Sequence, residues 1–252
     1  MRPTVDTSVI DAGPRPSPLQ ADLVALLRAT QAAEHDLFGA LDAVTRDAGN
    51  TIGSWSAKDV QAHLAAWRSI EARRLEASAR GDGAAAHPGD PALDAPVDES
   101  NAHLHGQHAD WSWEAVAREA DASIEALIDV IGRSTSNALC ECNDDVAGIG
   151  ANGANHAMGH LSEIALLAGG HEAFDAFANE METILRRNHL PPRDSGVILY
   201  NLACHRALAG ELDEARRVLR AAFARRHDLL EAAREDPDLA ALGDELASLA
   251  AG

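Results

Sequence analysis

Residues 55–70, WSAKDVQAHLAAWRSI, decide the fold class of this chain. Ser56 and Asp59 have the spacing of a helix capping box, and Trp55 precedes them as a hydrophobic staple. Apolar, aromatic and histidine side chains then share one helical stripe: Val60, His63, Leu64, Trp67 and Ile70. The pattern predicts a helix from Ser56 to about Arg80, with His63 turned toward the core.

The rest of the chain has the same helical character. Aromatic residues make up only 4% of it, and β-branched residues rarely alternate with polar ones, which predicts an all-α fold. Helical periods predict further long helices over 17–47, including Val44, over 112–132 and over 154–168. Ser17 and Gln20 form a capping box at the start of the first of these helices.

Two segments interrupt the helical periods. Residues 81–96, GDGAAAHPGDPALDAP, predict a crossover too long for a hairpin turn, and residues 134–153 predict an irregular segment because they hold several glycines. We therefore expect a flexible N-terminal arm over 1–16, a four-helix bundle with a long crossover over 17–169, and shorter helices over 170–252.

Shorter helices are predicted over 171–188, 194–209 and 211–226. Residues 196–223, GVILYNLACHRALAGELDEARRVLRAAF, resemble a tetratricopeptide-type helical hairpin, and residues 229–242 resemble the acidic segment that closes such repeats. A lone hairpin cannot bury its own apolar face. We expect it to pack on the preceding helix, on the bundle or on a second copy of the chain.

Charge and composition exclude several classes of partner. The chain has 21 Lys and Arg against 40 Asp and Glu, a net charge of −19, which disfavours nucleic acid and anionic membranes. It contains no apolar run long enough to cross a bilayer, and its 3 cysteines cannot all pair internally. These features predict a cytoplasmic protein.

Two histidines stand four residues apart in NHAMGH, residues 155–160. In a helix, His156 and His160 share one side, so both imidazoles can hold one metal ion. His63 is the one other histidine that its helical period turns toward a core, and three imidazoles would leave a coordination position open. On spacing alone a structural interpretation stays open, because the chain has 12 histidines and core histidines are often simply hydrogen-bonded.

Three segments together resemble the DinB-like superfamily. Residues 55–68 are similar to its second-helix signature, and NHAMGHLSEI, residues 155–164, is similar to the HxxxH of its fourth helix. Residues 98–128 resemble the approach to the third helix in the branch of mycothiol-dependent maleylpyruvate isomerases and colibactin-resistance-type proteins. The resemblance covers about residues 17–169.

This resemblance implies a divalent metal, zinc or nickel, held by His63, His156 and His160. It also implies a low-molecular-weight thiol as co-substrate and a transferase, isomerase or hydrolase reaction on a small electrophilic molecule. The alternative is a non-catalytic ligand-binding or protein-interaction module. In that case the C-terminal helices would recruit a protein partner or form a homodimer.

Other side chains are candidates for the same site. Glu163 follows His156 by seven residues, so it can orient a ligand, take a proton or lie in solvent. Glu34 interrupts the apolar stripe of the first helix, which places it either in the pocket or at a partly exposed edge. Trp67 is a candidate for the core or the pocket wall.

Remaining histidines and the cysteines have plainer interpretations. His103, His105 and His108, in HLHGQH, have a spacing found in metallohydrolases, but a surface turn is the favoured interpretation because no strands are predicted. Cys140 and Cys142 can bind metal, although without a second pair a loop position is favoured. Cys204 is expected to be a small buried residue.

Overall fold

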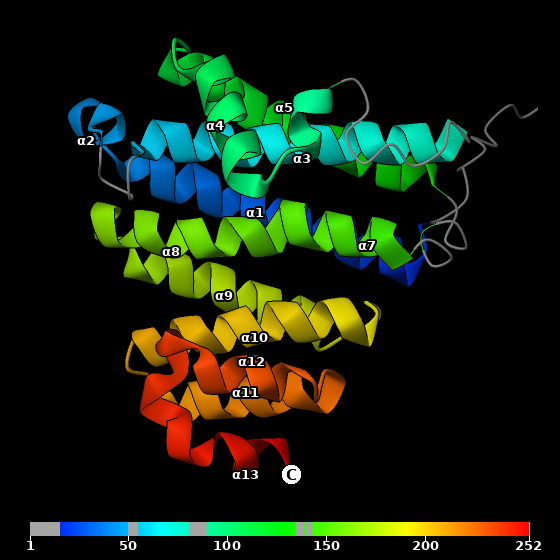
Figure 1. Cartoon of the computed structure of the whole chain (residues 1–252), viewed down its shortest axis with the longest axis vertical. Helices are drawn as coiled ribbons and strands as arrows, with labels where there is room; N and C mark the ends of the chain where they lie inside the picture. The colour runs from blue at the N-terminus through cyan, green and yellow to red at the C-terminus, as the bar shows by residue number, and fades with distance from the viewer. Residues whose placement is uncertain (1–15, 50–54, 81–89, 135–138, 140–142, 252) are drawn as a thin grey trace, which may run out of the picture.

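The computed structural model describes residues 16–49, 55–80, 90–134, 139 and 143–251. These residues form helices joined by short connections, and among them there is no β-strand (Figure 1). The all-α prediction is therefore confirmed for the described chain. The expected arm over 1–16 and most of the expected crossover lie outside the described residues.

Four helical rods lie side by side in the first part of the chain (Figure 1). They are α1 (Pro18–Ala40), α3 (Ala57–Arg80), α5 (Trp113–Arg133), and a rod made of α7 (Asn143–Gly150) and α8 (His156–Ala168). Helix α3 packs along α5, and α1 contacts both α5 and α8. This packing places α3 and α8 face to face, which is the relation that the histidine pattern requires.

The predicted helix starts are confirmed by their hydrogen bonds. Ser17 Oγ accepts from the backbone of Gln20 at 3.2 Å, and Gln20 Oε1 accepts from the backbone of Ser17 at 2.9 Å. Ser56 Oγ accepts from the backbone of Asp59 at 3.1 Å, and the Asp59 carboxylate accepts from the backbone of Ser56 at 2.9 Å. These reciprocal bonds satisfy backbone N–H groups that a helix start otherwise leaves unpaired.

The first predicted helix is shorter than the sequence pattern indicated. Helix α1 ends at Ala40, and a separate short helix, α2 (Ala43–Asp47), begins after Asp42, whose carboxylate accepts from the backbone of Thr45 at 2.7 Å. The prediction of one helix to residue 47 was therefore wrong. Val44 is 81% exposed because this new cap redirects the chain away from the core.

The glycine-rich segment before His156 was predicted to be irregular, and this was also wrong. Residues 143–150 form α7, and a π-helical turn, η2 (Ala151–Asn155), joins it to α8. Position 148 holds a glycine because a Cβ there would overlap the Glu71 carboxylate. A Cβ at Gly153 would likewise overlap the Leu27 side chain. These glycines allow close packing rather than break the helix.

The histidine-rich segment is a helix, not the surface turn that was favoured. A short 3-10 helix, η1 (Pro91–Asp94), leads into α4 (Val97–His108), and α4 packs on α3. Ser100 holds this connection, because its hydroxyl donates to Ala95 O at 3.2 Å. Helix α4 thereby covers part of the α3 face that carries His63.

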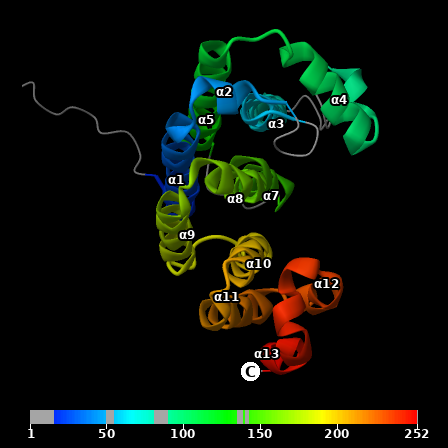
Figure 2. The same ribbon diagram turned by 90° about the vertical axis from the view of Figure 1, so that its left-hand side faces the viewer.

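The C-terminal part continues the stack (Figure 2). Its elements are α9 (His171–Leu185), α10 (Pro192–Leu208), α11 (Leu212–Arg225), α12 (Leu229–Glu235), η3 (Pro237–Glu245) and α13 (Leu246–Ala250). Helix α9 lies against α1, and α10 and α11 form an antiparallel pair around Gly210, whose φ is +79°. Small residues pack where the two helices meet, with Ala203 and Ala215 both 0% exposed.

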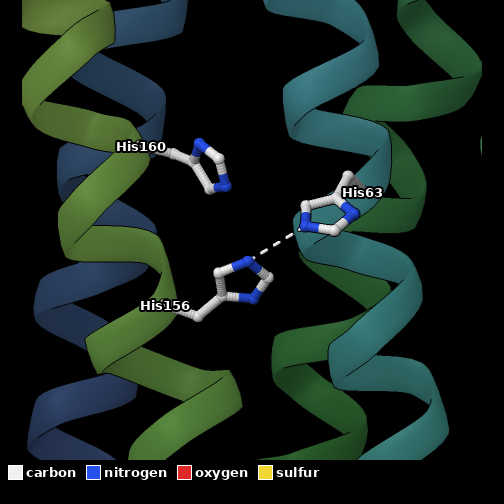
Figure 3. Close-up of side chains that lie close together, drawn as sticks. All are labelled: His63, His156 and His160. Atoms are coloured by element: carbon white, nitrogen blue, oxygen red, sulfur yellow. Dashed lines mark hydrogen bonds between the residues drawn. The ribbon is translucent and has the colours of Figure 1, made fainter. Parts of the chain in front are cut away.

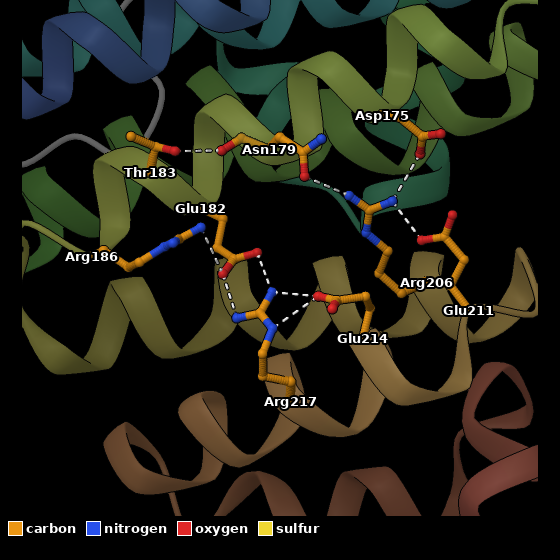
Figure 4. Close-up of polar contacts among 9 residues, drawn as sticks. All are labelled: Asp175, Asn179, Glu182, Thr183, Arg186, Arg206, Glu211, Glu214 and Arg217. Atoms are coloured by element: carbon orange, nitrogen blue, oxygen red, sulfur yellow. Dashed lines mark hydrogen bonds and ion pairs between the residues drawn. The ribbon is translucent and has the colours of Figure 1, made fainter.

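Ion pairs join α9 to α10 and α11 (Figure 4). Arg206 donates to Asp175 at 2.9 Å, to Asn179 at 2.9 Å and to Glu211 at 2.6 Å. Arg217 donates to both carboxylate oxygens of Glu182, at 2.6 and 2.7 Å. These pairs fix how the three helices meet.

One hydrophobic core extends through both parts of the chain. It runs from Leu23 in α1 through Phe174 in α9 to Leu249 in α13. The division near residue 170 stays a prediction, because apolar packing is continuous there. No helix among the described residues has both the length and the apolar character needed to cross a membrane.

Candidate metal centre

Three histidine rings meet between α3 and α8. His63 comes from the second turn of α3, and His156 and His160 come from the first turns of α8 (Figure 3). The ring centroids are 4.7 Å apart for His63 and His156, 5.5 Å for His63 and His160, and 5.2 Å for His156 and His160. One ring nitrogen from each residue lies within 4.8 Å of the other two. We call these residues the histidine trio.

The nitrogen atoms have distinct partners. His63 Nε2 lies 2.9 Å from His156 Nε2, and His160 Nδ1 lies 3.2 Å from the Glu163 carboxylate. The bond to Glu163 leaves His160 Nε2 free to face the other two rings. A carboxylate that holds the outer nitrogen of a ligating histidine fixes its tautomer and orientation, so Glu163 lies where an orienting residue would.

The electrostatics keep the inner rings neutral. Burial, with smaller effects from His156 and His160, lowers the pKa of His63 to about 3. Burial also lowers the pKa of His156 to about 4, with smaller effects from His160 and from the Arg68 guanidinium. Because metal ions bind the neutral imidazole, both rings are ready to ligate at neutral pH without losing a proton.

The distances between the ring nitrogens of the trio are close to those between the ligands of a tetrahedral metal ion. Nitrogen ligands at 2.0–2.1 Å from a tetrahedral ion stand about 3.3 Å apart. The His63 and His156 nitrogens, at 2.9 Å, lie slightly closer than this, and every pair in the trio is within 4.8 Å. Small ring movements would bring all three into ligating positions.

One ring nitrogen of His63, Nδ1, is buried without a hydrogen-bond partner among the described residues. His63 is 7% exposed, and its Nδ1 has no hydrogen-bond partner in the described structure. Leaving such a group unmet costs about 1–3 kcal/mol, and histidines retained for packing usually have partners. His63 Nε2 faces His156, so the fit to a metal ion rests on the converging nitrogens; the unpartnered Nδ1 lacks the second hydrogen bond that orients most metal-bound histidines.

Aromatic side chains wall the trio. The centroids of the Trp55 and His63 rings are 4.7 Å apart. The His105 ring, from α4, lies parallel to the Trp55 ring, with centroids 5.9 Å apart and an interplanar angle of 4°. Trp67 stands edge-on to His63 at 6.4 Å, and its Nε1 donates to Asn101 at 3.0 Å. Trp67 thus lies beside the trio, as expected for a wall residue.

Glu34 is buried in a different arrangement from those expected. It is 1% exposed, and both carboxylate oxygens accept from Arg68, which is 0% exposed. Glu34 therefore belongs to a buried ion pair and neither projects freely into a pocket nor lies at an exposed edge. Sequence reasoning did not single out Arg68, although a buried glutamate in an apolar stripe signals a buried cation.

The HLHGQH histidines do not meet. His103 Nε2 lies 3.0 Å from Asp90, His105 lies 3.6 Å from Asp59, and His108 Nδ1 lies 2.7 Å from Leu104 O. Residues two apart on a helix point in nearly opposite directions, so the helical conformation separates His103 from His105. Gly159, which directly precedes His160, has open space where a Cβ would lie, so no close contact requires a glycine there.

A second group of donor atoms lies between α10 and η3. Cys204, Asp236 and Asp238 each offer one atom within 4.8 Å of the others, and the Tyr200 hydroxyl donates to Asp236 at 2.7 Å. Burial raises the pKa of the Cys204 thiol, and Asp236 raises it further, so the thiol is protonated at neutral pH. Cys204 is buried, as expected, whereas Cys140 and Cys142 lie outside the described residues.

Searches against protein-family models, curated proteins and solved structures found no match. The geometry of the histidine trio therefore carries the functional argument.

Proposed function

We propose that the histidine trio binds one divalent metal ion, zinc or nickel, in a DinB-like four-helix bundle. The observation that carries this proposal is the convergence of three imidazoles from α3 and α8, of which buried His63 and partly buried His156 are held neutral. Three neutral imidazoles are a ligand set that suits these metals and leaves a position open. The four rods of the first part of the chain are the arrangement that the DinB-like resemblance implies.

The chemistry proposed for this centre is thiol-dependent transfer or isomerisation on a small electrophilic molecule. A bound divalent ion lowers the pKa of a thiol at its open position, which supplies a thiolate at neutral pH. Glu163 holds His160 in orientation through Nδ1. Trp55 and Trp67 limit the access of water on the His63 side and offer apolar surface to the substrate.

Metal analysis of the untagged full chain tests the site. We expect one divalent ion per chain, lost in His63→Ala and His160→Ala but retained in His103→Ala, whose ring pairs with Asp90 instead. A wild-type protein that takes up neither zinc nor nickel on titration would overturn the metal site. Equal loss of metal in His103→Ala would also overturn it, because the trio would then not be the binding site.

Turnover assays test the reaction class separately. The metal-loaded protein should consume a small electrophile in the presence of a low-molecular-weight thiol, and the His160→Ala protein should not. Metal binding without thiol-dependent turnover across a panel of electrophiles would leave the metal site intact and reject the transferase and isomerase proposals.

A second candidate function is non-catalytic binding, with the C-terminal helices as the interaction surface. Leu166 on α8 and Leu208 at the end of α10 are 70% and 65% exposed, and neither contributes to the trio. The α10–α11 pair would then serve as a tetratricopeptide-like hairpin that a protein partner or a second copy covers. Sedimentation of the full chain, compared with Leu208→Ser, tests the homodimer, which should dissociate in the variant.

A further inference from the structure

A cavity of about 200 Å³ lies outside the histidine trio, between the α7–η2 rod and the start of α10. The α7–η2 rod contributes small residues and Asn155, α10 contributes both charged and apolar side chains, and Arg226 also lines the cavity. The residues used below are Gly150, Ala151, Asn155, Arg193, Asp194 and Arg226. The cavity shares no residue with the trio, although Asn155 directly precedes His156.

Asp194 is a buried carboxylate without a partner from another residue. It is 9% exposed, and among the described residues no other group donates a hydrogen bond to its side chain and no cation lies within 4.0 Å of it. Burial raises the pKa of its carboxyl, while Arg193 and Arg226 act in the opposite direction from farther away. A desolvated carboxylate that lines a cavity needs a donor, and this chain supplies only the backbone N–H of Asp194 itself.

Two guanidinium groups stand beside this carboxylate in a chain whose net charge is −19. Arg226 is fixed, because it pairs with Asp228 at 2.7 and 2.5 Å and its side chain covers Gly196, where a Cβ would lie 2.6 Å from its Cγ. Arg193 is exposed and makes no ion pair in the described structure. Arg193 is therefore the positive group that is free to bind an anion at this cavity.

The opposite wall leaves space for a ligand. A Cβ at Gly150 would meet no atom within 4 Å, so this glycine borders open volume. The volume is below the range of drug-sized pockets and suits a molecule of few heavy atoms. Asn155 is engaged by Asn201 at 2.7 Å, which holds the η2 wall against α10.

The geometry points to a binding site for a small zwitterion of the α-amino acid type, with its ammonium group on Asp194 and its carboxylate on Arg193. Such a ligand supplies the donor that Asp194 lacks and the anion that Arg193 lacks, and both pairs are charge-assisted. A simple anion would leave Asp194 unmet, and a simple cation would leave Arg193 unmet. The site requires no metal and stands independently of the proposed reaction.

Calorimetric titration of the full chain with the common α-amino acids tests this site, with and without a chelator. At least one should bind in both conditions, and its analogues that lack either the amine or the carboxylate should bind about tenfold more weakly or worse. Asp194→Asn and Arg193→Ala should weaken binding by a similar factor. Gly150→Leu should abolish binding without unfolding the protein, because its side chain would fill the cavity.

Asp213→Asn is the matched control, since Asp213 is a fully exposed carboxylate in the first turn of the neighbouring helix α11. It should leave amino acid binding unchanged. The inference is overturned if no amino acid binds, if Asp194→Asn binds as tightly as the wild type, or if Asp213→Asn weakens binding equally. Because Gly150→Leu leaves every charge in place, it separates loss of the cavity from a general electrostatic effect.

Discussion

Polar side chains on α3 and those between α9, α10 and α11 differ in how fully they are hydrogen-bonded. Among the described residues, the fully buried side-chain atoms that lack any hydrogen-bond partner all belong to residues 46–68, and three of them are on α3: Gln61 Oε1, His63 Nδ1 and Arg68 Nε. Between α9, α10 and α11, by contrast, Arg206 and Arg217 meet carboxylate and amide oxygens at 2.6–2.9 Å.

The difference lies in how fully the polar atoms of α3 and those of the C-terminal arginines are hydrogen-bonded. A sequence selected only for stability satisfies its buried polar atoms, as Arg206 does in the C-terminal part. Unmet atoms persist where another requirement outweighs their cost, and such departures concentrate at functional sites. The contrast therefore sets α3, which carries His63, apart from the ion pairs that join α9, α10 and α11.

The largest effect on stability should come from breaking the buried pair of Arg68 and Glu34. Arg68→Met leaves the Glu34 carboxyl buried without its cation, so the free energy of unfolding should fall by about 3–5 kcal/mol. Chemical denaturation of the metal-free protein measures this loss. The double variant Arg68→Met/Glu34→Leu removes both charges and should recover most of it. A single variant as stable as the wild type would show that the pair is not needed to support α3.

Acid sensitivity of the metal-free protein is the next largest effect. Unfolded histidine has a pKa of about 6.5, whereas burial lowers the pKa of His63 to about 3 and of His156 to about 4. The unfolded chain therefore takes up protons first as the pH falls below about 6.5. Stability present above this pH is lost progressively toward about pH 4, by up to about 1.4 kcal/mol per histidine per pH unit.

Urea denaturation at several pH values between about 7 and 5 measures this slope. The C-terminal pairs should contribute little over the same range, because Arg217 lowers the pKa of the Glu182 carboxyl and its stabilisation is lost only below about pH 4.5. His63→Leu should reduce the slope, and Arg217→Met should leave it unchanged. A flat wild-type profile would contradict the buried neutral state of His63 and His156.

Sequence patterns predicted the helix starts well because capping is a local interaction. The boxes at Ser17 and Ser56 involve residues three apart, and both form as expected. The helical α7 was missed because its glycines favour irregular structure until distant residues fill the space, as Glu71 does beside Gly148. The identity of such a neighbour depends on tertiary packing, which no local pattern contains.

For the candidate site, the inward direction of His63 was predictable, whereas its electrostatic support was not. The apolar stripe of α3 turned His63 to the core, and the structure confirms its burial. The pairing of Arg68 with Glu34 joins residues 34 apart in sequence. Nothing in the order of residues distinguishes Arg68 from the other arginines of α3, because only the position of α1 selects it.

A smaller effect is expected from the scaffold. Arg217→Met removes a bidentate pair with Glu182, but the Arg217 side chain is 48% exposed and Arg186 lies 3.1 Å from the same carboxylate. The loss should be about 1 kcal/mol or less, and smaller at high salt, because solvent and ions screen the pair. Thermal unfolding at two salt concentrations measures it. A loss as large as that of Arg68→Met would remove the distinction between the two regions.

Gly159→Ala should change the free energy of unfolding least, and it should raise it where the other substitutions lower it. Gly159 is exposed within α8, and a Cβ there would meet no atom within 4 Å. Alanine lowers the entropy of the unfolded chain and favours the helix, so the variant should be more stable by about 0.5–1 kcal/mol. Metal affinity should not change, because the substitution leaves His156 and His160 on the same helical face. Weaker zinc binding in a more stable Gly159→Ala protein would show that the trio needs backbone freedom in α8. In that case glycine at position 159 would serve metal binding at the expense of helix stability.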